Sequence, residues 1–562
     1  MTGRPHHQVT EALLRVRDAD RTASPYPALR RLTAELGAGQ PMITDQPRLR
    51  NLLELTAAAD PRLFHVMFLH HCMTLGPALD YGAHPADLDA LASGSFVGAA
   101  LMTELGRGNS SAAIRTEAVL DRACGEFVLH SPEPGAAKYP PNVGEPGVPR
   151  LATVSARLRV DGTDRGVFLF LVELRDAHAT APGVTIRRHP PTALLPLDYA
   201  TVRFDRVRIP GHRWLADGAT LTPDGGFHDP AGGAGERTRR SLGMSRFAWG
   251  AVTVGLAAAA RAAVSIALPH ALRRITADRN GGERTALDHR DQQRLLFGAA
   301  ADAYTATVLA RQVTAACWDI PAGGGRGRGP SPEVMSTLAL TKAAVDLLAD
   351  RAVARCRSAT GALGFFSENR LVDYQALTAA FHSAGGDNRL IMLDAARSLA
   401  AQPAPPAGLA HLRDEDGLGA LFRTHERTLH EDLTERLARA AADGADPADA
   451  WDDQSALAGA LARAHVTRTA AETALPRQAD DPVAADLLRA ARLDRVVSDP
   501  AGYLMSGLAT ADQVTSWSLA LDGIHDRLRP LAARVVDLMA VPPALLDSPL
   551  ARPDYIAALS GE

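Results

Sequence analysis

The stretch from Ala100 to Ser111, ALMTELGRGNSS, gathers residue types that bind a planar or anionic group. Gly106 and Gly108 have no Cβ atom, so a ligand can come close to their backbone. Thr103 and the polar residues 109–111 add short hydrogen-bonding side chains and backbone N–H donors. A Gly-x-Gly with hydroxyl neighbours is also a common turn before a helix. We therefore interpret this stretch as a candidate cofactor loop, with a plain turn as the alternative.

Four potential metal ligands lie close together in the N-terminal part: His65, His70, His71 and Cys72. Their spacing does not place two ligands one helical turn apart with a carboxylate between them, so we favour core or interface histidines over a metal site. The four cysteines of the chain show no metal-ligand spacing and no disulfide framework. We predict that the protein binds no metal and keeps its thiols reduced.

The composition limits the classes of partner. The chain has 562 residues, 46% of them hydrophobic, a formal net charge of −4 and only two lysines, Lys138 and Lys342. So small a net charge makes nucleic acid and acidic membrane surfaces unexpected partners. The most Ala-rich part, 249–268, is interrupted by Arg261 and followed by Pro269, and no signal peptide is visible. We expect a cytoplasmic protein with no membrane span.

The spacing of apolar residues divides the chain into four segments. Residues 1–98 have helical spacing, and residues 99–216 alternate as strands do, bounded by Gly, Pro and Asp. Residues 217–400 contain long Ala-rich amphipathic helices, and residues 401–562 form a further helical block after a Pro/Ala linker. We predict a mainly α fold with an inserted antiparallel β-barrel or sandwich domain, and two helical bundles that flank and follow it.

This order of elements, with two adjacent motifs, resembles the oxidase branch of the acyl-CoA dehydrogenase superfamily. The motifs are MTELGRGNSSAAIRTEAVLD and GEFVLHSPEPGAAKYPPNVG. Further similar segments are RFDRVRIP, DHRDQQRLLF, ATGALGFFSENRLVDY and GGDN, so the resemblance covers nearly the whole chain. It implies an acyl-CoA oxidase-like fold, FAD as the cofactor, and an acyl thioester of CoA or of an acyl-carrier protein as the substrate. It also implies a homodimer, or a heteromer with a paralogue.

The resemblance also assigns candidate cofactor-binding residues. Hydroxyl and N–H donors stabilise the negative charge that reduction places along one edge of a flavin, and a guanidinium binds phosphate oxygens with two hydrogen bonds. The segment that begins at Lys138 and Tyr139 is expected near the reactive edge. Gly361 and Gly364 resemble a glycine turn that approaches the dinucleotide from a partner subunit. The full set is Thr103, Gly106, Gly108, Ser131, Arg279, Gln293, Gly361, Gly364 and Asn388.

The carboxylate that removes the acyl α-proton in this family is missing from its expected position. In the oxidases it is the glutamate of Glu-Gly-Asp-Asn, and here Gly385 stands at that place. Some relatives carry the glutamate before an arginine, where this chain has Ser245. Since neither residue can accept the proton, we consider His382 and Asp387, the nearest ionisable residues in sequence, as catalytic candidates.

Three functions remain open. The first is FAD-dependent α,β-desaturation of an acyl thioester by an atypical acyl-CoA oxidase-like enzyme, in bacterial specialised metabolism. The second is a flavin-dependent monooxygenase that hydroxylates or epoxidises its substrate and needs no α-proton abstraction. The third is a catalytically inactive binding or scaffold homologue. We expect the first.

Overall fold

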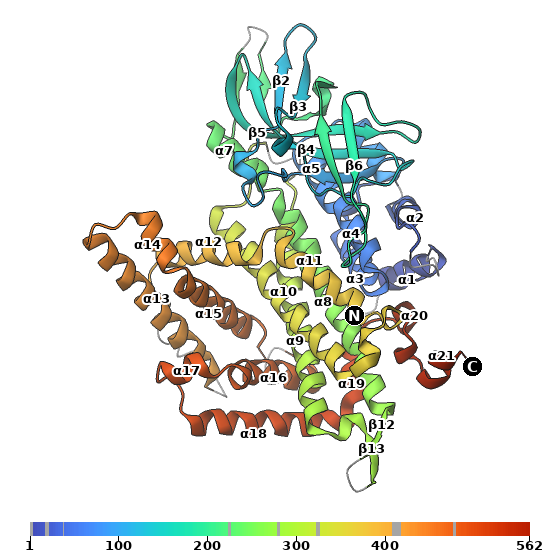
Figure 1. The fold of residues 1–562 in the computed structure, drawn as a ribbon, viewed down its shortest axis with the longest axis vertical. Coiled ribbons are helices and arrows are strands. Elements are labelled where there is room, and N and C mark those ends of the chain that lie inside the picture. Colours follow the sequence, from blue (N-terminus) through green and yellow to red (C-terminus); the bar gives the residue numbers. More distant parts are fainter. Residues whose placement is uncertain are drawn as a thin grey trace. The chain divides into compact units, whose positions relative to one another are not determined.

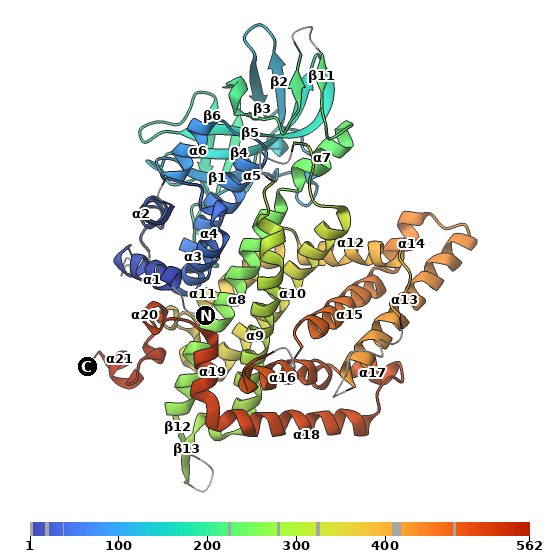
Figure 2. The same cartoon turned by 180° about the vertical axis from the view of Figure 1, so that it is seen from behind.

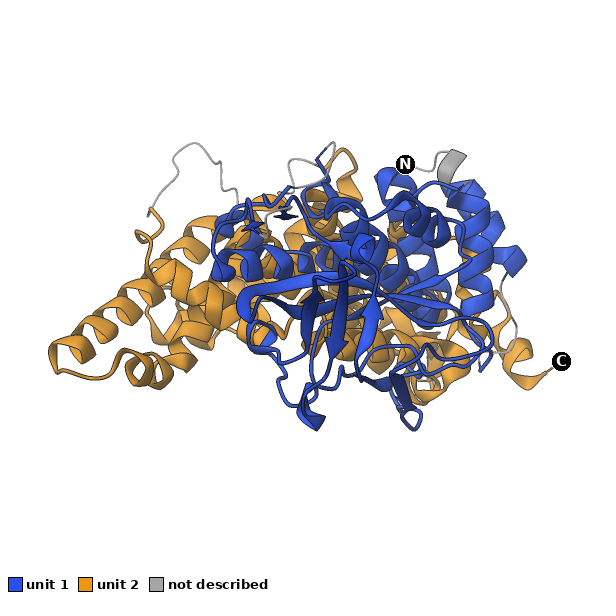
Figure 3. Cartoon of the chain, turned by 90° about the horizontal axis from the view of Figure 1, so that it is seen from above, with its two compact units in different colours: residues 1–255, 314–335 blue, residues 256–313, 336–562 orange. Residues whose placement is uncertain are grey.

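The computed structural model describes residues 4–16, 22–37, 39–222, 226–277, 281–321, 326–406, 417–475 and 479–561. The chain divides into two compact units, one formed by residues 1–255 and 314–335, the other by residues 256–313 and 336–562 (Figure 3). The division cuts through three long helices, α8 (Ser245–Arg273), α9 (Arg290–Trp318) and α10 (Pro332–Ala359). The four segments 1–98, 99–216, 217–400 and 401–562 therefore stay a prediction.

Unit 1 begins with helices whose ends are set by local capping. Asp60 accepts a hydrogen bond from the Arg62 backbone N–H, and Pro61 occupies the first helical position, so α3 ends and α4 begins there. A π-helical turn, His71–Leu75, follows α4. These helices are α1 (Arg4–Val16), α2 (Tyr26–Gly37), α3 (Gln46–Ala59), α4 (Pro61–His70), α5 (Gly76–Asp80) and α6 (Pro85–Ala92).

A curled seven-stranded sheet follows in the same unit (Figure 1). Its order is β8-β3-β2-β4-β5-β9, β1 also pairs with β4, and β6 and β7 form a separate two-stranded sheet. The strands are β1 (Val97–Leu101), β2 (Glu117–Asp121), β3 (Glu126–His130), β4 (Arg150–Val160), β5 (Thr163–Arg175), β6 (Val184–Arg188), β7 (Ala200–Phe204), β8 (Val207–Ile209) and β9 (Trp214–Leu215). Phe127, Phe168, Phe170 and Trp214 pack together in its core.

The sheet departs from a purely antiparallel arrangement at one place, which positions the candidate cofactor loop. Both β1 and β2 run parallel to β4. β1 pairs with 150–154 and β2 with 157–159, so they follow one another along the same edge of β4. Residues 102–116 leave this edge between the two strands. The loop is therefore anchored at both ends by the same neighbouring strand.

Unit 2 is helical, apart from the hairpin β12 (Ile275–Ala277) and β13 (Glu283–Thr285). Leu340, Met392, Leu433 and Leu461 belong to a core shared by α10, α12, α13 and α15, and Figures 1 and 2 both show α13 beside α15. The remaining helices are α11 (Leu371–Ser383), α12 (Asn388–Ala400), α13 (Leu418–Ala442), α14 (Pro447–Asp453), α15 (Ser455–Thr473), α16 (Pro482–Ser498), α17 (Ala501–Met505), α18 (Ala511–Leu528), α19 (Ala532–Met539), α20 (Pro543–Leu546) and α21 (Tyr555–Ser560).

The predicted fold class is confirmed, because helices precede and follow an inserted, mostly antiparallel β domain. Between the sheet and α8 the chain forms the short strands β10 (Thr220–Leu221) and β11 (Phe227–His228) and the helix α7 (Ala234–Leu242). In the part of the chain that the structure describes, one stretch, Ala234–Arg273, is long and apolar enough to cross a membrane. Its apolar window is entirely buried inside the protein, as in a core helix.

Candidate functional site

The loop that follows β1 is closed by the buried carboxylate of Glu104. Its Oε1 atom accepts hydrogen bonds from the Thr116 backbone N–H at 2.9 Å and from the Thr116 hydroxyl at 2.7 Å. Its Oε2 atom accepts one from the Arg115 backbone N–H at 2.8 Å. Glu104 thus ties the start of the loop to its end, just before β2, and fixes the path of the residues between them.

Lys138 completes this anchor from inside the β domain. Its fully buried ammonium group lies 3.3 Å from Glu104 Oε1 and donates to the Ser155 hydroxyl at 3.2 Å. Burial lowers the pKa of Lys138 to about 8, and the Glu104 charge opposes that shift. Burial by itself would raise the pKa of Glu104, but Lys138 and the Thr116 hydrogen bonds bring it below its usual value. Both groups are held as a charged pair, so the Lys138 side chain points into the protein interior.

Several hydrogen-bond donors of the loop are not used by this anchor. Among the residues that the structure describes, the hydroxyl of half-buried Thr103 and the backbone N–H groups of Gly108 and Asn109 have no hydrogen-bond partner. The Thr103 carbonyl, in contrast, accepts from the Tyr139 N–H at 3.0 Å, which fixes that residue's backbone. The loop therefore presents hydrogen-bond donors between two anchored ends.

The two loop glycines have different roles. A Cβ on Gly106 would lie 3.2 Å from the Cα of Gly135, and the Gly106 N–H donates to the Gly135 carbonyl at 2.9 Å. A Cβ on Gly108 would meet nothing within 4 Å. Both glycines are exposed, but Gly106 packs closely against Gly135, whereas Gly108 has open space beside it and leaves its backbone accessible.

Ser131, assigned to the cofactor by resemblance, lies just after β3 and is buried. Its hydroxyl oxygen accepts from the Phe204 N–H at 3.2 Å, and its own N–H donates to the Phe204 carbonyl at 2.8 Å. The residue therefore joins the end of β3 to β7. The rest of unit 1's expected set, Thr103, Gly106 and Gly108, lies together on the loop described above.

The remaining assigned residues belong to unit 2, except Arg279, which lies outside the described residues. Gln293 is buried near the start of α9, where its amide donates to the Leu287 carbonyl at 3.0 Å and accepts from Arg290 at 2.9 Å. Gly361 has φ +64°, in the left-handed region. A Cβ on Gly364 would lie 2.4 Å from the Thr360 hydroxyl oxygen, so the turn between α10 and α11 requires glycine there.

The segment that lacks the family's glutamate is a short link between α11 and α12. Gly385 and Gly386 have φ values of +65° and +92°, both in the left-handed region. Asp387 is the N-cap of α12, and its carboxylate accepts from the Arg389 backbone N–H at 2.9 Å. That role accounts for an aspartate at this position without any part in proton transfer.

A buried polar cluster supports this link, and sequence reasoning missed two of its members, Lys342 and Asp346. The Lys342 ammonium group donates to the carbonyls of Ala384 at 3.1 Å and Gly386 at 2.9 Å, and to Asn388 Oδ1 at 2.8 Å. The Asn388 amide in turn donates to Asp346. The side-chain oxygen and the amide group of Asn388 therefore both form hydrogen bonds within the protein. The available signal was the rarity of lysine: the chain's two lysines are both fully buried.

His382, the other catalytic candidate, lies on α11 beside this cluster. Its Nε2 atom is 3.7 Å from Asp346 Oδ2, and its side chain is 41% exposed while that of Asp346 is fully buried. Burial raises the pKa of Asp346, and Lys342 and His382 oppose that shift. The structure thus brings His382 together with a buried carboxylate, which is an arrangement able to hold and release a proton.

The rings of His70 and His71 pack edge to face with their centroids 4.6 Å apart, but each N-terminal histidine has its own hydrogen-bond partner. His65 Nε2 lies 3.0 Å from the Asn142 side-chain oxygen, and His70 Nδ1 accepts from the Gly98 N–H at 2.8 Å. His71 Nε2 lies 3.3 Å from the Thr33 hydroxyl. Burial lowers the pKa of His65 and His70 to about 4, so both are neutral. Within the described ranges no group of three His, Cys, Asp or Glu residues could hold a metal ion.

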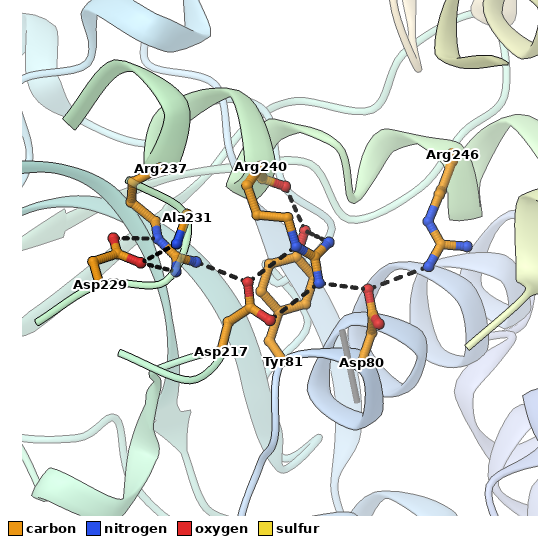
Figure 4. A network of polar contacts seen from close by, with 8 residues as sticks. All are labelled: Asp80, Tyr81, Asp217, Asp229, Ala231, Arg237, Arg240 and Arg246. Atoms are coloured by element: carbon orange, nitrogen blue, oxygen red, sulfur yellow. Dashed lines mark hydrogen bonds and ion pairs between the residues drawn. The ribbon is translucent and has the colours of Figure 1, made fainter. Parts of the chain in front are cut away.

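Unit 1 also contains a buried ionic network that no sequence pattern indicated (Figure 4). Asp217 accepts from Arg237 at 2.8 Å and pairs with Arg240 Nε at 3.0 Å. Asp80 pairs with Arg240 at 3.1 Å and with Arg246 at 3.2 Å. The network joins the end of α5, the residues after β9, α7 and the start of α8. It places Arg246 against Asp80, and the hydroxyl of its neighbour, Ser245, donates to the Leu242 carbonyl.

Comparisons with known proteins agree with this architecture. A family model of the acyl-CoA oxidase C-alpha1 domain matches residues 250–400, and a model described as acyl-CoA oxidase matches residues 416–554. Together the two models cover more than half of the chain. The chain belongs to the acyl-CoA oxidase/acyl-CoA dehydrogenase superfamily.

Individual relatives are more distant. An acyl-coenzyme A oxidase-like protein of Mus musculus is 29% identical over 317 residues, covering 55% of this chain and 49% of that protein. The chain thus spans about half the length of the curated relatives it matches. The crystal structure of acyl-CoA oxidase 1 from Yarrowia lipolytica has a TM-score of 0.83 at 19% identity, covering 100% of this chain and 90% of that chain. Acyl-CoA oxidase-1 of Caenorhabditis elegans, complexed with FAD and ATP, also has a TM-score of 0.83, at 20% identity, covering 99% and 89%.

Proposed function

We propose that this protein is an FAD-dependent oxidoreductase that oxidises an acyl thioester by α,β-desaturation. The observation that carries the proposal is membership of the acyl-CoA oxidase family, whose models match 250–400 and 416–554. The same fold in the FAD complex of the Caenorhabditis elegans oxidase supports the choice of cofactor. CoA is the proposed carrier, and an acyl-carrier protein is a second one that the test below distinguishes.

The loop after β1 fits a flavin. A flavin presents carbonyl and ring-nitrogen acceptors along one edge, and the loop offers the Thr103 hydroxyl and the N–H groups of Gly108 and Asn109 as donors without partners in the described chain. Bound FAD would supply the hydride acceptor. The loop's task is to orient the ring and to stabilise negative charge on that edge, from donors that the Glu104–Lys138 pair holds in place.

Proton removal is the step for which the chain's own residues differ most from its family. Gly385 and Ser245 carry no carboxylate, and Asp387 is committed to capping α12. We assign the proton-accepting role to His382, with Asp346 behind it to stabilise the positive charge that the imidazole gains. The His382 side chain is 41% exposed, so a substrate can reach it, and the buried Asp346 carboxylate lies 3.7 Å from its Nε2 atom.

The deciding experiment adds acyl thioesters to the purified flavoprotein under anaerobic conditions. Loss of the flavin absorbance with an acyl-CoA supports the proposal, and loss only with an acyl-carrier-protein thioester identifies that carrier. No bleaching with either class contradicts α,β-desaturation.

The missing carboxylate at Gly385 favours one other candidate, a flavin-dependent monooxygenase. This enzyme would need an external reductant and would consume oxygen in step with an oxygenated product. Oxygen uptake without a coupled product contradicts it, and turnover that requires a second, paralogous chain points to a scaffold subunit instead.

The proposal also includes an oligomeric state and a cellular location. Phe365 and Phe366, which follow Gly361 and Gly364 in the turn before α11, are 74% and 52% exposed. Exposed aromatic residues beside this turn support a contact with a second subunit, so we propose a homodimer. We also propose a cytoplasmic enzyme of bacterial specialised metabolism. Light scattering of the purified protein tests the dimer.

A further inference from the structure

A small pocket, with room for about one water-sized group, lies among five helices of unit 2. It is lined by residues of α9, α10, α13, α15 and α16, and most of its wall is apolar, with Leu348, Phe422 and Leu488 the largest members. Its polar lining consists of Thr305, Thr467, Arg492 and Arg495. Two arginines and two hydroxyls facing one pocket, without a carboxylate in its lining, are complementary to an anion.

The two carboxylates that act on Arg495 in the described part of the chain, Asp302 and Asp494, are already neutralised by other arginines. Asp302, on α9, is almost fully buried, pairs closely with Arg351 and lies 3.3 Å from Arg355. Asp494, on α16, lies 2.8 Å from Arg355 and 3.8 Å from Arg351. The Arg351 and Arg355 charges keep the pKa of Asp302 below its usual value despite burial. These four side chains balance one another.

Arg495 takes no part in these ion pairs. In the part of the chain that the structure describes, its guanidinium has neither a hydrogen bond nor an ion pair, and the Thr467 hydroxyl, which is also in the lining, has no hydrogen-bond partner there. Burial, followed by repulsion from Arg351, lowers the pKa of Arg495 to about 10, although Asp302 and Asp494 oppose that shift. Arg492 adds a second positive charge and donates to the Ala471 carbonyl at 3.2 Å.

We propose that this pocket is a binding site for a compact anion, held by the guanidinium of Arg495 with Thr467 and Arg492 as further donors. An unpaired guanidinium in a partly dry pocket is costly, and an anion restores both its hydrogen bonds and the local charge balance. The surrounding wall of Ala, Leu and Phe side chains leaves room for a single small anion of the size of chloride. This inference concerns the helices of unit 2 alone and does not depend on the proposed oxidation reaction.

Thermal unfolding of the full-length protein tests the site. The protein is exchanged into sodium gluconate, whose anion is bulky, and gluconate is then replaced by chloride or phosphate at constant ionic strength. We expect a saturable rise in Tm of roughly 2–4 °C for the wild type with the anion that fits. Arg495→Gln should lose this rise. Arg489→Gln, on the same helix, removes the same charge from a partly exposed position and should keep it.

A direct measurement covers the case in which Arg495→Gln does not fold. Crystals of the wild-type protein grown in bromide should give an anomalous difference peak within about 4 Å of the Arg495 guanidinium. Arg495→Lys, which keeps the charge and loses the planar fork, should keep a response to chloride but require a higher chloride concentration. A Tm rise of equal size in wild type and Arg495→Gln, or no rise and no bromide peak in the wild type, overturns the proposal.

Discussion

The Nζ atom of Lys138 lies 3.3 Å from Oε1 of Glu104, and neither side chain is exposed to solvent. Lys138 follows the β3 segment and Glu104 lies in the loop after β1, so this one ion pair holds together the two motifs that carry the family resemblance. The attraction between the two charges offsets the free-energy cost of burying them. Loss of either one leaves a buried charge without its counterion.

Lys138→Met should therefore lower the free energy of unfolding by about 3–5 kcal/mol, because Glu104 keeps its buried charge without a partner. Urea unfolding followed by circular dichroism measures the loss. The matched control is Arg122→Gln, which breaks the exposed Arg122–Asp161 pair and should cost far less stability, because solvent screens both charges. Equal losses in the two variants would show that the buried pair has no special role.

Asp217 should be similarly sensitive, since it is fully buried between the guanidinium groups of Arg237 and Arg240. Asp217→Asn keeps an acceptor oxygen but removes the negative charge, so we expect a loss of about 3–5 kcal/mol in the free energy of unfolding. Glu236→Gln breaks an exposed pair with Arg239 on the same helix and serves as the control. A loss below about 1 kcal/mol for Asp217→Asn would contradict a structural role for the network.

Stability should fall as the pH drops from about 6.5 to about 4. Burial lowers the pKa of His65 and His70 to about 4 in the folded protein, whereas unfolded histidines take up protons near pH 6.5. Over that window the unfolded state binds more protons, so the free energy of unfolding rises with pH. Urea titrations between pH 8 and pH 5 measure the slope.

The contribution of one histidine can be isolated. His70→Asn retains an acceptor for the Gly98 N–H and removes one titrating group, so the pH slope should become shallower. His7→Asn, at a side chain that is 79% exposed, should leave the slope unchanged. An identical slope in wild type and His70→Asn would show that His70 is not held neutral by burial.

Substitutions at Asp387 separate a capping residue from a catalytic base. Asparagine is as good an N-cap as aspartate but accepts no proton at neutral pH, so Asp387→Asn should keep both stability and kcat. Asp387→Ala should lose about 1 kcal/mol of stability through the lost cap on α12. Thermal unfolding and steady-state kinetics on the acyl thioester that bleaches the flavin provide both readouts. A collapse of kcat in Asp387→Asn would restore Asp387 as the base.

The sequence by itself determined the class of fold and indicated the loop after β1 as a candidate cofactor site, which stays a prediction. Those features depend on local physics: alternating apolar residues mark strands, the helical spacing marks α8–α10, and the small residues from Thr103 to Gly108 mark a loop that exposes its backbone. The family resemblance showed where a catalytic carboxylate is expected, and the glycine at position 385 shows directly that it is missing.

The tertiary structure decided what those residues do. Parallel pairing of β1 and β2 with β4, the burial of Lys138 against Glu104, and the gathering of Lys342, Asp346 and Asn388 are contacts between segments far apart in the chain. No local spacing encodes such contacts. The same holds for Arg495, because Asp302 and Asp494 form their ion pairs with Arg351 and Arg355 instead. A sequence gives only the number of charged residues. The energy of each charge depends on its burial and on its partners, and the folded structure determines these two properties.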